Sequence, residues 1–457
     1  MLAGTALAFA VARRRGPAGT LAWVFAILAF PIVGALAYFA LANPYVRRPR
    51  RRKRAANRAV REKNPAPTPP EPTVAHSPQV RGLLHAASRL TGLSPSGGNR
   101  VNLFNGGVDA FGAKEAAIRG AQRAIWAEYY TVLDDTTGHR FLRLLTERAK
   151  DGIDVRLLVD AVGTGSLGEP LAELSAAGGR VATFLPVNPL RRRWAVHLRN
   201  HRKILVVDGH TGFVGGMNVG DPYAGVRTAH ERPWRDAHLR VEGPAARDLA
   251  QVFDEDWTFM TGELLPLLPP AEPVGTATVA IVPSGPDQRE NAAGTLWFAC
   301  LGAAVERCWI STPYFVPDEP TVRALCAAAL RGCDVRIVIP EVSDVWFMSF
   351  VNRSFFPRLV AAGVRVWLYE PGMMHAKTLV IDDDLCLVGS ANVDVRSFRL
   401  NFEAGALVAD RAVADRLESG FRKDLERSRE VTREHLRARR PWVAVAEGAA
   451  QLLSPLL

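Results

Sequence analysis

A pattern of histidine, lysine and aspartate that occurs twice constrains the fold of this chain more than any other feature. Residues 201–208 read HRKILVVD and residues 375–382 read HAKTLVID. In each copy the histidine and lysine are two positions apart at the start of an apolar run, so on a strand they point to the same side. Each copy is followed by a glycine-containing turn, GFVGGMNVGD at 212–221 and CLVGSANVDVRS at 386–397. Two copies of the pattern with matching turns are improbable by chance, and they predict an internal duplication of the chain.

The duplication extends upstream of these segments. Each copy is preceded by a helical pattern with a strand and then by a second strand, at residues 116–132 and 152–160 in the first copy and at 301–316 and 332–340 in the second. Helical patterns that alternate with apolar strands are typical of layered α/β folds. The sequence therefore predicts an α/β protein with two similar domains, residues 81–270 and 271–457, related by a pseudo-twofold axis.

The two H-x-K segments carry the groups that phosphoryl transfer needs. A pseudo-twofold would bring both to one cleft, where lysines supply positive charge for a phosphate and histidines supply a nucleophile and a general acid. The glycines of the following turns let the backbone approach closely, and amides and a hydroxyl add donors. The expected site comprises His201, Lys203, His375, Lys377, Asn218, Ser390 and Asn392.

Cofactor and metal motifs are not part of the expected site. The chain contains no G-x-x-x-x-G-K-[ST], and no H-x-K segment has the ligand spacing of a zinc site. The five cysteines all lie in the second half of the chain without a C-x-x-C pair, which favours buried, reduced thiols. We therefore predict phosphoryl transfer that uses no metal and no cofactor.

The amino-terminal stretch at residues 18–42 contains no charged residue, and a helix needs about 20 apolar residues to cross a bilayer. Pro31 and Gly34 are tolerated in membrane helices. The alternative is a cleaved signal peptide that begins with Arg13–Arg15. Its apolar segment would exceed the usual length of about 7–15 residues, and no clean A-x-A site follows. We predict a retained membrane anchor over residues 1–46.

Basic residues follow this stretch directly: Arg47, Arg48, Arg50, Arg51, Arg52, Lys53 and Arg54. Residues 1–63 carry 13 Lys and Arg and one acid, a net charge of +12, whereas the whole chain carries +11, so the remainder nets about −1. The positive-inside rule places the domains on the cytoplasmic side of the membrane, and the cluster is expected to attract anionic lipids. A protein whose folded domains bind nucleic acid would carry a basic charge on those domains. The remainder of this chain is close to neutral, so no nucleic-acid partner is expected. Residues 47–80, proline-rich from 64, are expected to form a linker.

The paired H-x-K-x-x-x-x-D motif with its G-[GS]-x-N turn resembles the signature of the phospholipase D superfamily. Within it the chain is similar to the bacterial cardiolipin synthases. Blocks outside the motif carry that closer resemblance, among them EYY, WRDAHLRVEGPA, VPSGPD, STPYFVPDE, LNFE and a terminal LLSPLL. The resemblance implies two phospholipase D-like α/β sandwich domains behind an amino-terminal transmembrane anchor.

The resemblance also implies a reaction. One phosphatidylglycerol gives its phosphatidyl group to a histidine and releases glycerol, and a second phosphatidylglycerol takes the group up as cardiolipin. By analogy His201 is the nucleophile and His375 the acid and base. An acid downstream of each motif orients its histidine, which implies Asp236 for the first motif and Glu403 for the second. Asp208 and Asp382 complete the catalytic motifs and are expected to support the fold.

Other interpretations stay open from the sequence. The motif fits a hydrolase of the same superfamily, with water as acceptor, as well as a transferase. The acceptor lipid and the oligomeric state are not specified. His238 is expected to be a packing residue, and Tyr129, Tyr130, Tyr314 and Phe315 either line a lipid channel or belong to the core. Residues 441–457 fit an interfacial or a packing helix equally well.

Overall fold

The computed structural model describes residues 2–12, 17–41, 47–65, 69–165, 167–186, 198–227, 232–288 and 290–451. It divides into two compact units, residues 1–52 and 53–457. The terminal LLSPLL block lies outside the described residues.

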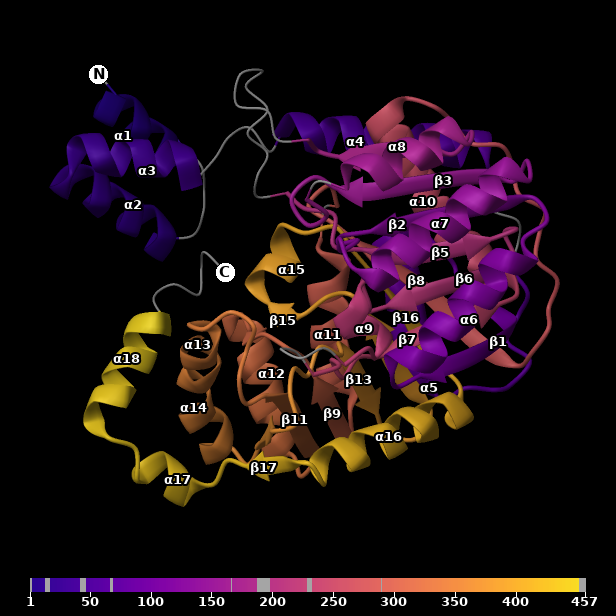
Figure 1. Ribbon diagram of the computed structural model, residues 1–457. Helices are drawn as coiled ribbons and strands as arrows, with labels where there is room; N and C mark the ends of the chain where they lie inside the picture. Colours follow the sequence, from indigo (N-terminus) through magenta and orange to yellow (C-terminus); the bar gives the residue numbers. More distant parts are fainter. Residues whose placement is uncertain are drawn as a thin grey trace. The chain divides into compact units, whose positions relative to one another are not determined.

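The first unit is a small cluster of apolar helices. Its members are α1 (Leu2–Ala12), α2 (Pro17–Ala29), α3 (Pro31–Leu41) and the first residues of α4 (Arg47–Lys63), and α1 to α3 lie side by side (Figure 1). Ala6, Ala10, Ile27, Ala35 and Tyr38 form its buried centre. The ring centroids of Trp23 in α2 and Tyr38 in α3 are 5.4 Å apart.

The single span predicted for residues 18–42 is divided in two at Phe30. Pro31 cannot donate a backbone hydrogen bond and clashes with the preceding turn, so it begins a new helix. Gly34 then lets α3 fold back on α2, because a Cβ atom there would lie 2.4 Å from the carbonyl oxygen of Ala26. Among the described residues, no helix has both the length and the apolar character needed to cross a membrane.

The second unit is built on one 15-stranded sheet. The strand order is β17-β12-β11-β9-β13-β14-β16-β8-β1-β7-β6-β5-β2-β3-β4. The first half supplies β1 (Ser96–Phe104), β2 (Ala124–Tyr129), β3 (Asp154–Asp160), β4 (Arg180–Phe184), β5 (Lys203–Val207), β6 (Thr211–Gly215) and β7 (His238–Glu242). The second half supplies β8 (Ala277–Ser284), β9 (Arg307–Ser311), β11 (Asp334–Pro340), β12 (Arg365–Tyr369), β13 (Thr378–Ile381), β14 (Leu385–Gly389), β16 (Glu403–Ala409) and β17 (Ser428–Glu430). A separate pair joins β10 (Phe315–Val316) to β15 (Val393–Asp394).

The strand order displays the predicted duplication. Starting from the central pair β1 and β8, the order 1-7-6-5-2-3-4 on one side corresponds to 8-16-14-13-9-11-12 on the other. In both halves the strand after the H-x-K segment pairs antiparallel with the strand that carries Trp126 or Trp309. The predicted α/β class and the two similar halves are confirmed, and the halves share one sheet. The domain boundaries at residues 80 and 270 stay a prediction.

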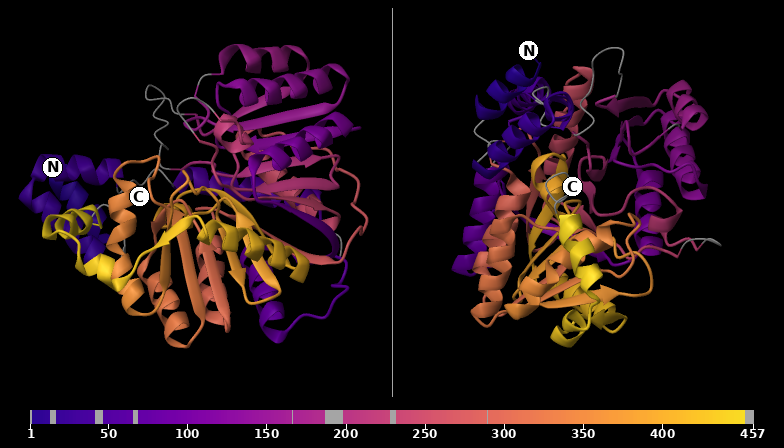
Figure 2. Two further views of the ribbon diagram at one scale, coloured as in Figure 1. Left: turned by 60° about the horizontal axis from the view of Figure 1, so that its bottom comes forward. Right: turned by 90° about the vertical axis from the view of Figure 1, so that its left-hand side faces the viewer.

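Helices cover both faces of each half-sheet (Figure 2). Alternate strand residues such as Ile125 and Leu157 pack on α6 (Gly107–Gly120), α7 (Thr136–Lys150) and α8 (Gly168–Ala176). From the opposite face Trp126 stacks on Phe253 of α10 (Pro244–Thr261). The second half repeats this arrangement, with α11 (Ala292–Ala303) and α12 (Glu319–Leu330) on one face and Trp309 stacked on Phe421 of α16 (Arg411–Leu425) on the other.

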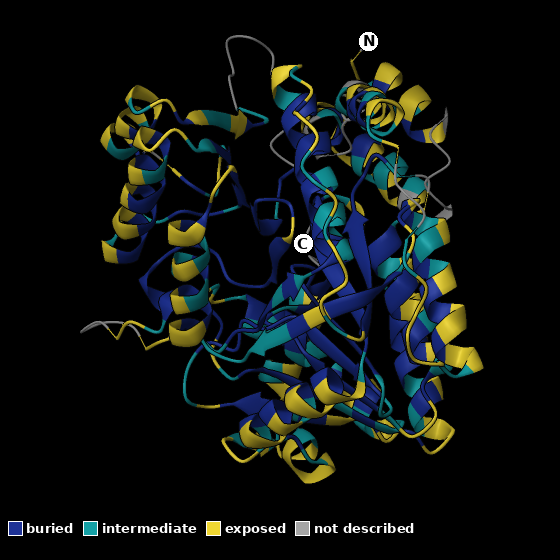
Figure 3. Ribbon diagram, turned by 90° about the vertical axis from the view of Figure 1, so that its right-hand side faces the viewer, coloured by how far each residue is buried: buried dark blue, intermediate teal, exposed yellow. Residues whose placement is uncertain are grey.

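The remaining helices lie at the edges and connections. They are α5 (Pro78–Thr91), α9 (Asp221–Ala224), α13 (Met348–Ser354), α14 (Phe356–Ala361), α15 (Val395–Arg399), α17 (Arg433–Arg437) and α18 (Pro441–Gln451). The strands are buried almost throughout, and exposed residues gather on the outer faces of the helices (Figure 3).

Part of the expected linker is folded into the second unit. In α4, Lys53 is fully buried, and its Nζ lies 2.7 Å from Asp256 Oδ1 of α10. Farther along α4, Arg61 Nε donates to Glu255 at 2.8 Å. Lys53 therefore neutralises a buried acid, although its place in the basic cluster predicted an interaction with lipid head groups.

Substituting Lys53 with methionine is expected to lower the free energy of unfolding by about 3–5 kcal/mol, because it leaves the buried Asp256 carboxylate without one of its cations. Arg58→Met is the matched control, since Arg58 is exposed on the same helix and should change stability by no more than about 0.5 kcal/mol. Thermal or denaturant unfolding in detergent measures both. Equal stability of the two variants would contradict the role assigned to Lys53.

Candidate active site

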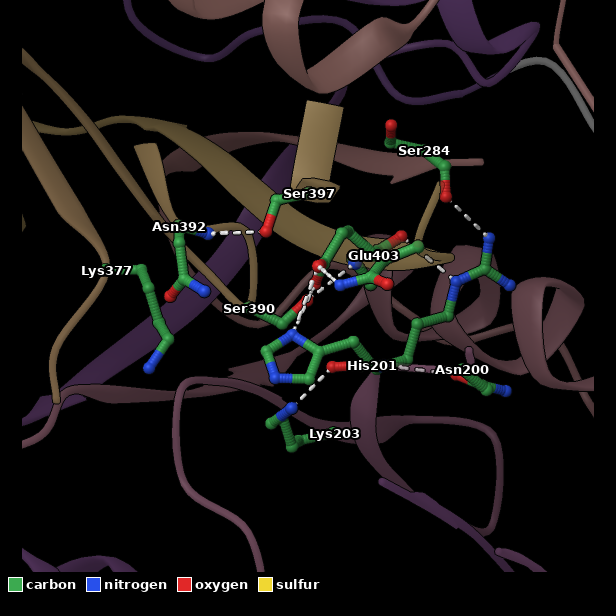
Figure 4. A network of polar contacts seen from close by, with 12 residues as sticks. Asn200, His201, Lys203, Ser284, Lys377, Ser390, Asn392, Ser397 and Glu403 are labelled. Carbon is green, nitrogen blue, oxygen red and sulfur yellow. Dashed lines mark hydrogen bonds and ion pairs between the residues drawn. The ribbon is translucent and has the colours of Figure 1, made fainter. Parts of the chain in front are cut away.

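The two H-x-K segments open into one cavity of about 320 Å³. His201 and His375 both line it, and so do Asn218 and Asn392 from the turns that follow β6 and β14. Each histidine lies just before the first residues of its strand, at the edge where the connecting loops of both halves gather. Figure 4 shows His201 and Lys203 of the first half together with Lys377 and Asn392 of the second.

The first H-x-K segment holds its two side chains firmly. His201 Nδ1 lies 3.0 Å from Glu403 Oε2 and 3.1 Å from Oε1, so the ring presents its other nitrogen, Nε2. Lys203 is fully buried, donates to the His201 carbonyl at 2.6 Å and places its Nζ 5.3 Å from the Tyr130 ring centroid. The lysine side chain is therefore fixed beside the histidine.

The second segment repeats the arrangement with a different acid. His375 Nδ1 lies 2.6 Å from Asp236 Oδ2. Lys377 Nζ lies 2.9 Å from Nδ1 and 3.0 Å from Nε2 of the same ring, and it also donates to the His375 carbonyl. Its ammonium group thus contacts the imidazole directly.

The histidine–carboxylate pairs cross between the halves, which corrects the pairing expected from the sequence. Each acid was expected to orient the histidine of its own motif, but Glu403 holds His201 and Asp236 holds His375. Backbone contacts bring about the exchange. His201 N donates to the Phe402 carbonyl at 2.8 Å, and His375 N donates to the Arg235 carbonyl at 2.7 Å. In each case the contacted residue directly precedes the carboxylate in sequence.

The turns after the two motifs differ at one position. The Ser390 hydroxyl, expected to bind phosphate, donates to Glu403 Oε2 at 2.5 Å and accepts from Ala404 N. Its counterpart Gly216 has no room for a side chain, because a Cβ there would lie 2.1 Å from Asp236 Oδ1. The structure therefore gives Ser390 a contact with the orienting acid, and a phosphate contact stays an untested expectation.

The two asparagines also differ in their contacts. Asn218 Oδ1 accepts from Thr131 N at 3.2 Å, and its amide donates to the Tyr223 hydroxyl at 3.0 Å. Asn392 Oδ1 is buried without a hydrogen-bond partner among the described atoms, although the residue lines the cavity. Both polar atoms of the Asn218 side chain therefore have protein partners, whereas the side-chain oxygen of Asn392 has none among the described atoms.

Each motif aspartate follows the carboxyl end of its strand, whereas the histidine of the same motif precedes the amino end. Asp208 follows β5 with φ +54° and accepts backbone hydrogen bonds from residues 122–124 at 2.8–2.9 Å. Asp382 follows β13 with φ +47° and accepts from residues 305–307. A carboxylate that receives three backbone N–H groups fixes the loop that enters the neighbouring strand. These contacts support the structural role expected for both residues.

Burial keeps both imidazoles neutral. It lowers the pKa of His201 against the opposing charge of Glu403. It also lowers the pKa of His375 to about 4, and the charge of Lys377 acts in the same direction while Asp236 opposes it. At neutral pH each ring therefore carries a lone pair on one nitrogen, as a nucleophile or a base requires.

The lysines and Glu403 are perturbed as well. Burial lowers the pKa of Lys203 well below its ordinary value and that of Lys377 to about 8. Burial opposes ionisation of Glu403, but His201, Lys203 and the Ser390 hydroxyl together lower its pKa. The acid is thus ionised at neutral pH, and a bound anion would favour the charged form of both lysines.

The value of kcat/KM is expected to fall as the pH rises through about 8. Below that pH the Lys377 ammonium is charged and is expected to attract an anionic substrate. Above that pH the charged fraction of Lys377 in the free enzyme falls about tenfold per pH unit. Lys377→Arg should move the decline to higher pH, because arginine stays protonated. A pH–rate profile measures both. An unchanged alkaline limb in Lys377→Arg would assign the limb to another group.

Several cavity residues were not predicted as site residues. They are Tyr223, Trp234, Arg199 and Arg396, whereas Tyr130 and Tyr314, for which a lining role was one of two alternatives, also line the cavity. Tyr223 and Trp234 flank the His375 ring at centroid distances of 5.2 and 5.0 Å, and Tyr130 lies 5.0 Å from His201. Arg396 lies within the segment CLVGSANVDVRS and Trp234 within the block WRDAHLRVEGPA, but no spacing rule identified either residue as part of the site. Tyr129, Phe315 and His238 are buried, and for His238 this confirms the packing role.

Metal ligands and disulfides are not features of the described part of the chain. It contains no group of three His, Cys, Asp or Glu side chains placed to hold a metal ion. All five cysteines are free thiols, four of them buried and Cys326 half-buried.

Comparison with known families matches both halves of the chain. Residues 115–257 and 298–425 match the family described as cardiolipin synthase, PLD-like domain. Residues 4–43 match the family described as phospholipase D-nuclease N-terminal.

Individual proteins agree with this. The chain is 38% identical over 451 residues to a cardiolipin synthase of Geobacillus kaustophilus (strain HTA426), which covers 97% of this chain and 90% of the relative. It is 35% identical to cardiolipin synthase A of Pseudomonas entomophila (strain L48), over 96% and 93% of the two chains. Its fold resembles the crystal structure of a phosphatidylserine synthase from Haemophilus influenzae Rd KW20, with a TM-score of 0.62 and 15% identity over 82% of this chain and 100% of the other.

Proposed function

The chain belongs to the cardiolipin synthase family of phospholipase D-like proteins, and from this premise we propose that it transfers a phosphatidyl group from one phosphatidylglycerol to another. The observation that carries the proposal is the presence of two histidines, each oriented by a buried carboxylate, in one cavity. Such a pair supplies a nucleophile on one side of a phosphate and a proton donor on the other.

The first step forms a covalent intermediate. His201 Nε2 attacks the phosphorus of phosphatidylglycerol, an N–P bond forms, and the P–O bond to the glycerol head group breaks. His375, which is neutral in the free enzyme, takes up a proton when the anionic phosphodiester binds beside it, and it gives that proton to the departing glycerol oxygen. His201 is assigned as nucleophile because its side chain is the more exposed of the two, at 14% against 8%, and the family resemblance favours the same choice.

The second step reverses the roles of the groups. His375 takes the proton from a hydroxyl of a second phosphatidylglycerol, the hydroxyl oxygen attacks phosphorus, and the N–P bond breaks. The products are cardiolipin and glycerol, and one phosphodiester replaces another without a net change of charge. Glu403 and Asp236 stabilise the imidazolium forms that arise during the cycle.

The phosphate is held by charge and by amide donors. Lys203 and Lys377 lie beside the two histidines, and in a buried site their charge offsets that of a pentavalent transition state. Asn218 and Asn392 are placed at the same cavity and complete the proposed phosphate site. A phosphatidyl acceptor, and not water, must then reach the phosphohistidine.

Attachment to the membrane through residues 1–46 is part of the proposal. The first unit exposes large apolar side chains, among them Phe25, Phe30, Ile32 and Val33. Exposed apolar surface marks contact with membranes or other proteins. The basic residues that follow support a cytoplasmic location for the catalytic unit.

Reconstitution tests the proposed function. The purified full-length chain is incubated with phosphatidylglycerol vesicles, EDTA and no nucleotide, and lipids and glycerol are followed by mass spectrometry. Cardiolipin and glycerol in equal amounts are expected. Phosphatidic acid with glycerol and without cardiolipin would make the protein a hydrolase, and a requirement for metal would overturn the proposed chemistry.

A further inference from the structure

The segment Glu341–Met348 connects β11 to α13 and forms part of the cavity wall. Val345, Phe347 and Met348 line the cavity. From the same segment Val342 and Trp346 are turned to the solvent and are 74% and 79% exposed. We call Val342 and Trp346 the apolar rim. Exposure of so much of a tryptophan ring to water is unfavourable, and it indicates that another surface covers this ring when the protein functions.

The apolar rim is held in place beside the cavity. The rings of Trp346 and Phe347 meet edge to face with centroids 5.6 Å apart, so the exposed ring touches the cavity wall. The Asp344 carboxylate accepts from the Tyr314 hydroxyl at 2.8 and 2.9 Å and from Val345 N at 3.0 Å. These bonds fix the segment and present Trp346 outward.

The size of the cavity determines what the rim contacts. About 320 Å³ accommodates roughly ten water molecules, which suits a phosphate and its head group but not two acyl chains. Each methylene moved from hydrocarbon into water costs about a factor of four in the partition equilibrium. The chains of a diacyl lipid therefore stay in the bilayer while its phosphate reacts, and the mouth of the cavity must lie against the bilayer surface.

A second element of the same unit has a matching character. Helix α18 packs along α13, where Ala450 contacts the group of Met348 and Val351 (Figure 1). It exposes Trp442 and Val445. The exposed Arg433, Arg437 and Arg440 precede it and suit an anionic lipid surface.

We infer that the apolar rim, Val342 and Trp346, inserts into an anionic lipid bilayer and thereby seats the catalytic cavity on its substrate. This inference rests on the proposed function for the identity of the substrate. Contact with the bilayer is a different interaction from attachment through residues 1–46, because it acts at the cavity mouth and controls the entry of lipid.

The test compares two physical forms of one substrate. Full-length wild type, Trp346→Ala and Leu330→Ala are assayed on phosphatidylglycerol vesicles and on monomeric short-chain phosphatidylglycerol. Leu330 is 75% exposed at the end of α12 opposite the cavity and serves as the matched control. Trp346→Ala is expected to lower the rate on vesicles about tenfold and to leave the rate on monomers unchanged, and Leu330→Ala should change neither.

A readout that needs no activity separates the two proposals. In vesicles with brominated acyl chains, the tryptophan quenching of wild type should exceed that of Trp346→Ala. If this difference is present but wild type makes no cardiolipin, the rim inserts and the proposed function is wrong. Equal quenching, an equal loss of rate on both substrates, or a change of oligomeric state in Trp346→Ala would each overturn the inference, the last by indicating a second copy as the occupant.

Discussion

Alanine at His201 is expected to abolish cardiolipin formation, with a loss of at least about 10⁴-fold in kcat. Without this ring no N–P bond can form, and the remaining groups have no nucleophile to activate. Alanine at His375 should cause a loss of similar size with glycerol as the leaving group, because nothing protonates the departing oxygen. Mass spectrometry of the lipid products measures both rates.

The two histidines can be told apart by their covalent intermediates. His375→Ala should still form a phosphatidyl-histidine from a substrate whose leaving group needs no proton, whereas His201→Ala should not. The control is His210→Ala, an exposed histidine on the turn after β5, which should keep wild-type activity. Turnover at the wild-type rate in either His201→Ala or His375→Ala would refute the two-histidine mechanism, and the reverse labelling pattern would exchange the two roles.

Alanine at Lys203 or at Lys377 is expected to lower kcat by about 10²–10³-fold, which is the usual effect of removing one group that stabilises transition-state charge. Both side chains are buried beside a histidine, so each charge acts in a medium that screens it weakly. KM should change less than kcat, because the negative charge on the phosphate oxygens grows in the transition state.

The lysine variants need a control for folding, because removing a buried side chain also removes packing. Lys150→Ala, on the exposed side of α7, should behave as wild type in rate and melting temperature. A Lys203→Ala or Lys377→Ala enzyme that melts normally and turns over at a near-normal rate would exclude that lysine from the phosphate site. Parallel losses of melting temperature and rate would assign the effect to the fold.

Much of the fold was predictable because its signals are local. The H-x-K segments run into apolar strands, the glycine turns follow at fixed distances, and the repeat of these signals predicts two α/β halves. The motif aspartates are another local signal, since Asp208 and Asp382 only need to reach the loops that enter β2 and β9. Such features depend on short-range geometry and on a strand's alternation.

The features that sequence reasoning missed depend on long-range contacts. Spacing along the chain associates Glu403 with the second motif, but the backbone bond between Phe402 and His201 brings it to the first. Hydropathy treats residues 18–42 as one uniform stretch, whereas Pro31 and Gly34 divide it into a hairpin. The partner of Lys53 is Asp256, about 200 positions away, and no pattern of charges near residue 53 predicts a buried ion pair.

The crossed histidine–carboxylate pairs have an evolutionary consequence. Neither half of the chain contains a working pair by itself, since each histidine depends on an acid from the other half. Two copies of a single ancestral half, associated about a twofold axis, would have formed both pairs at once by symmetry. A fusion of two such copies would therefore preserve a centre that the symmetric pair already formed, and it would allow the two copies to differ, as they do at Gly216 and Ser390. Loss of either half would leave the remaining histidine without its carboxylate, so the two halves can only be kept together.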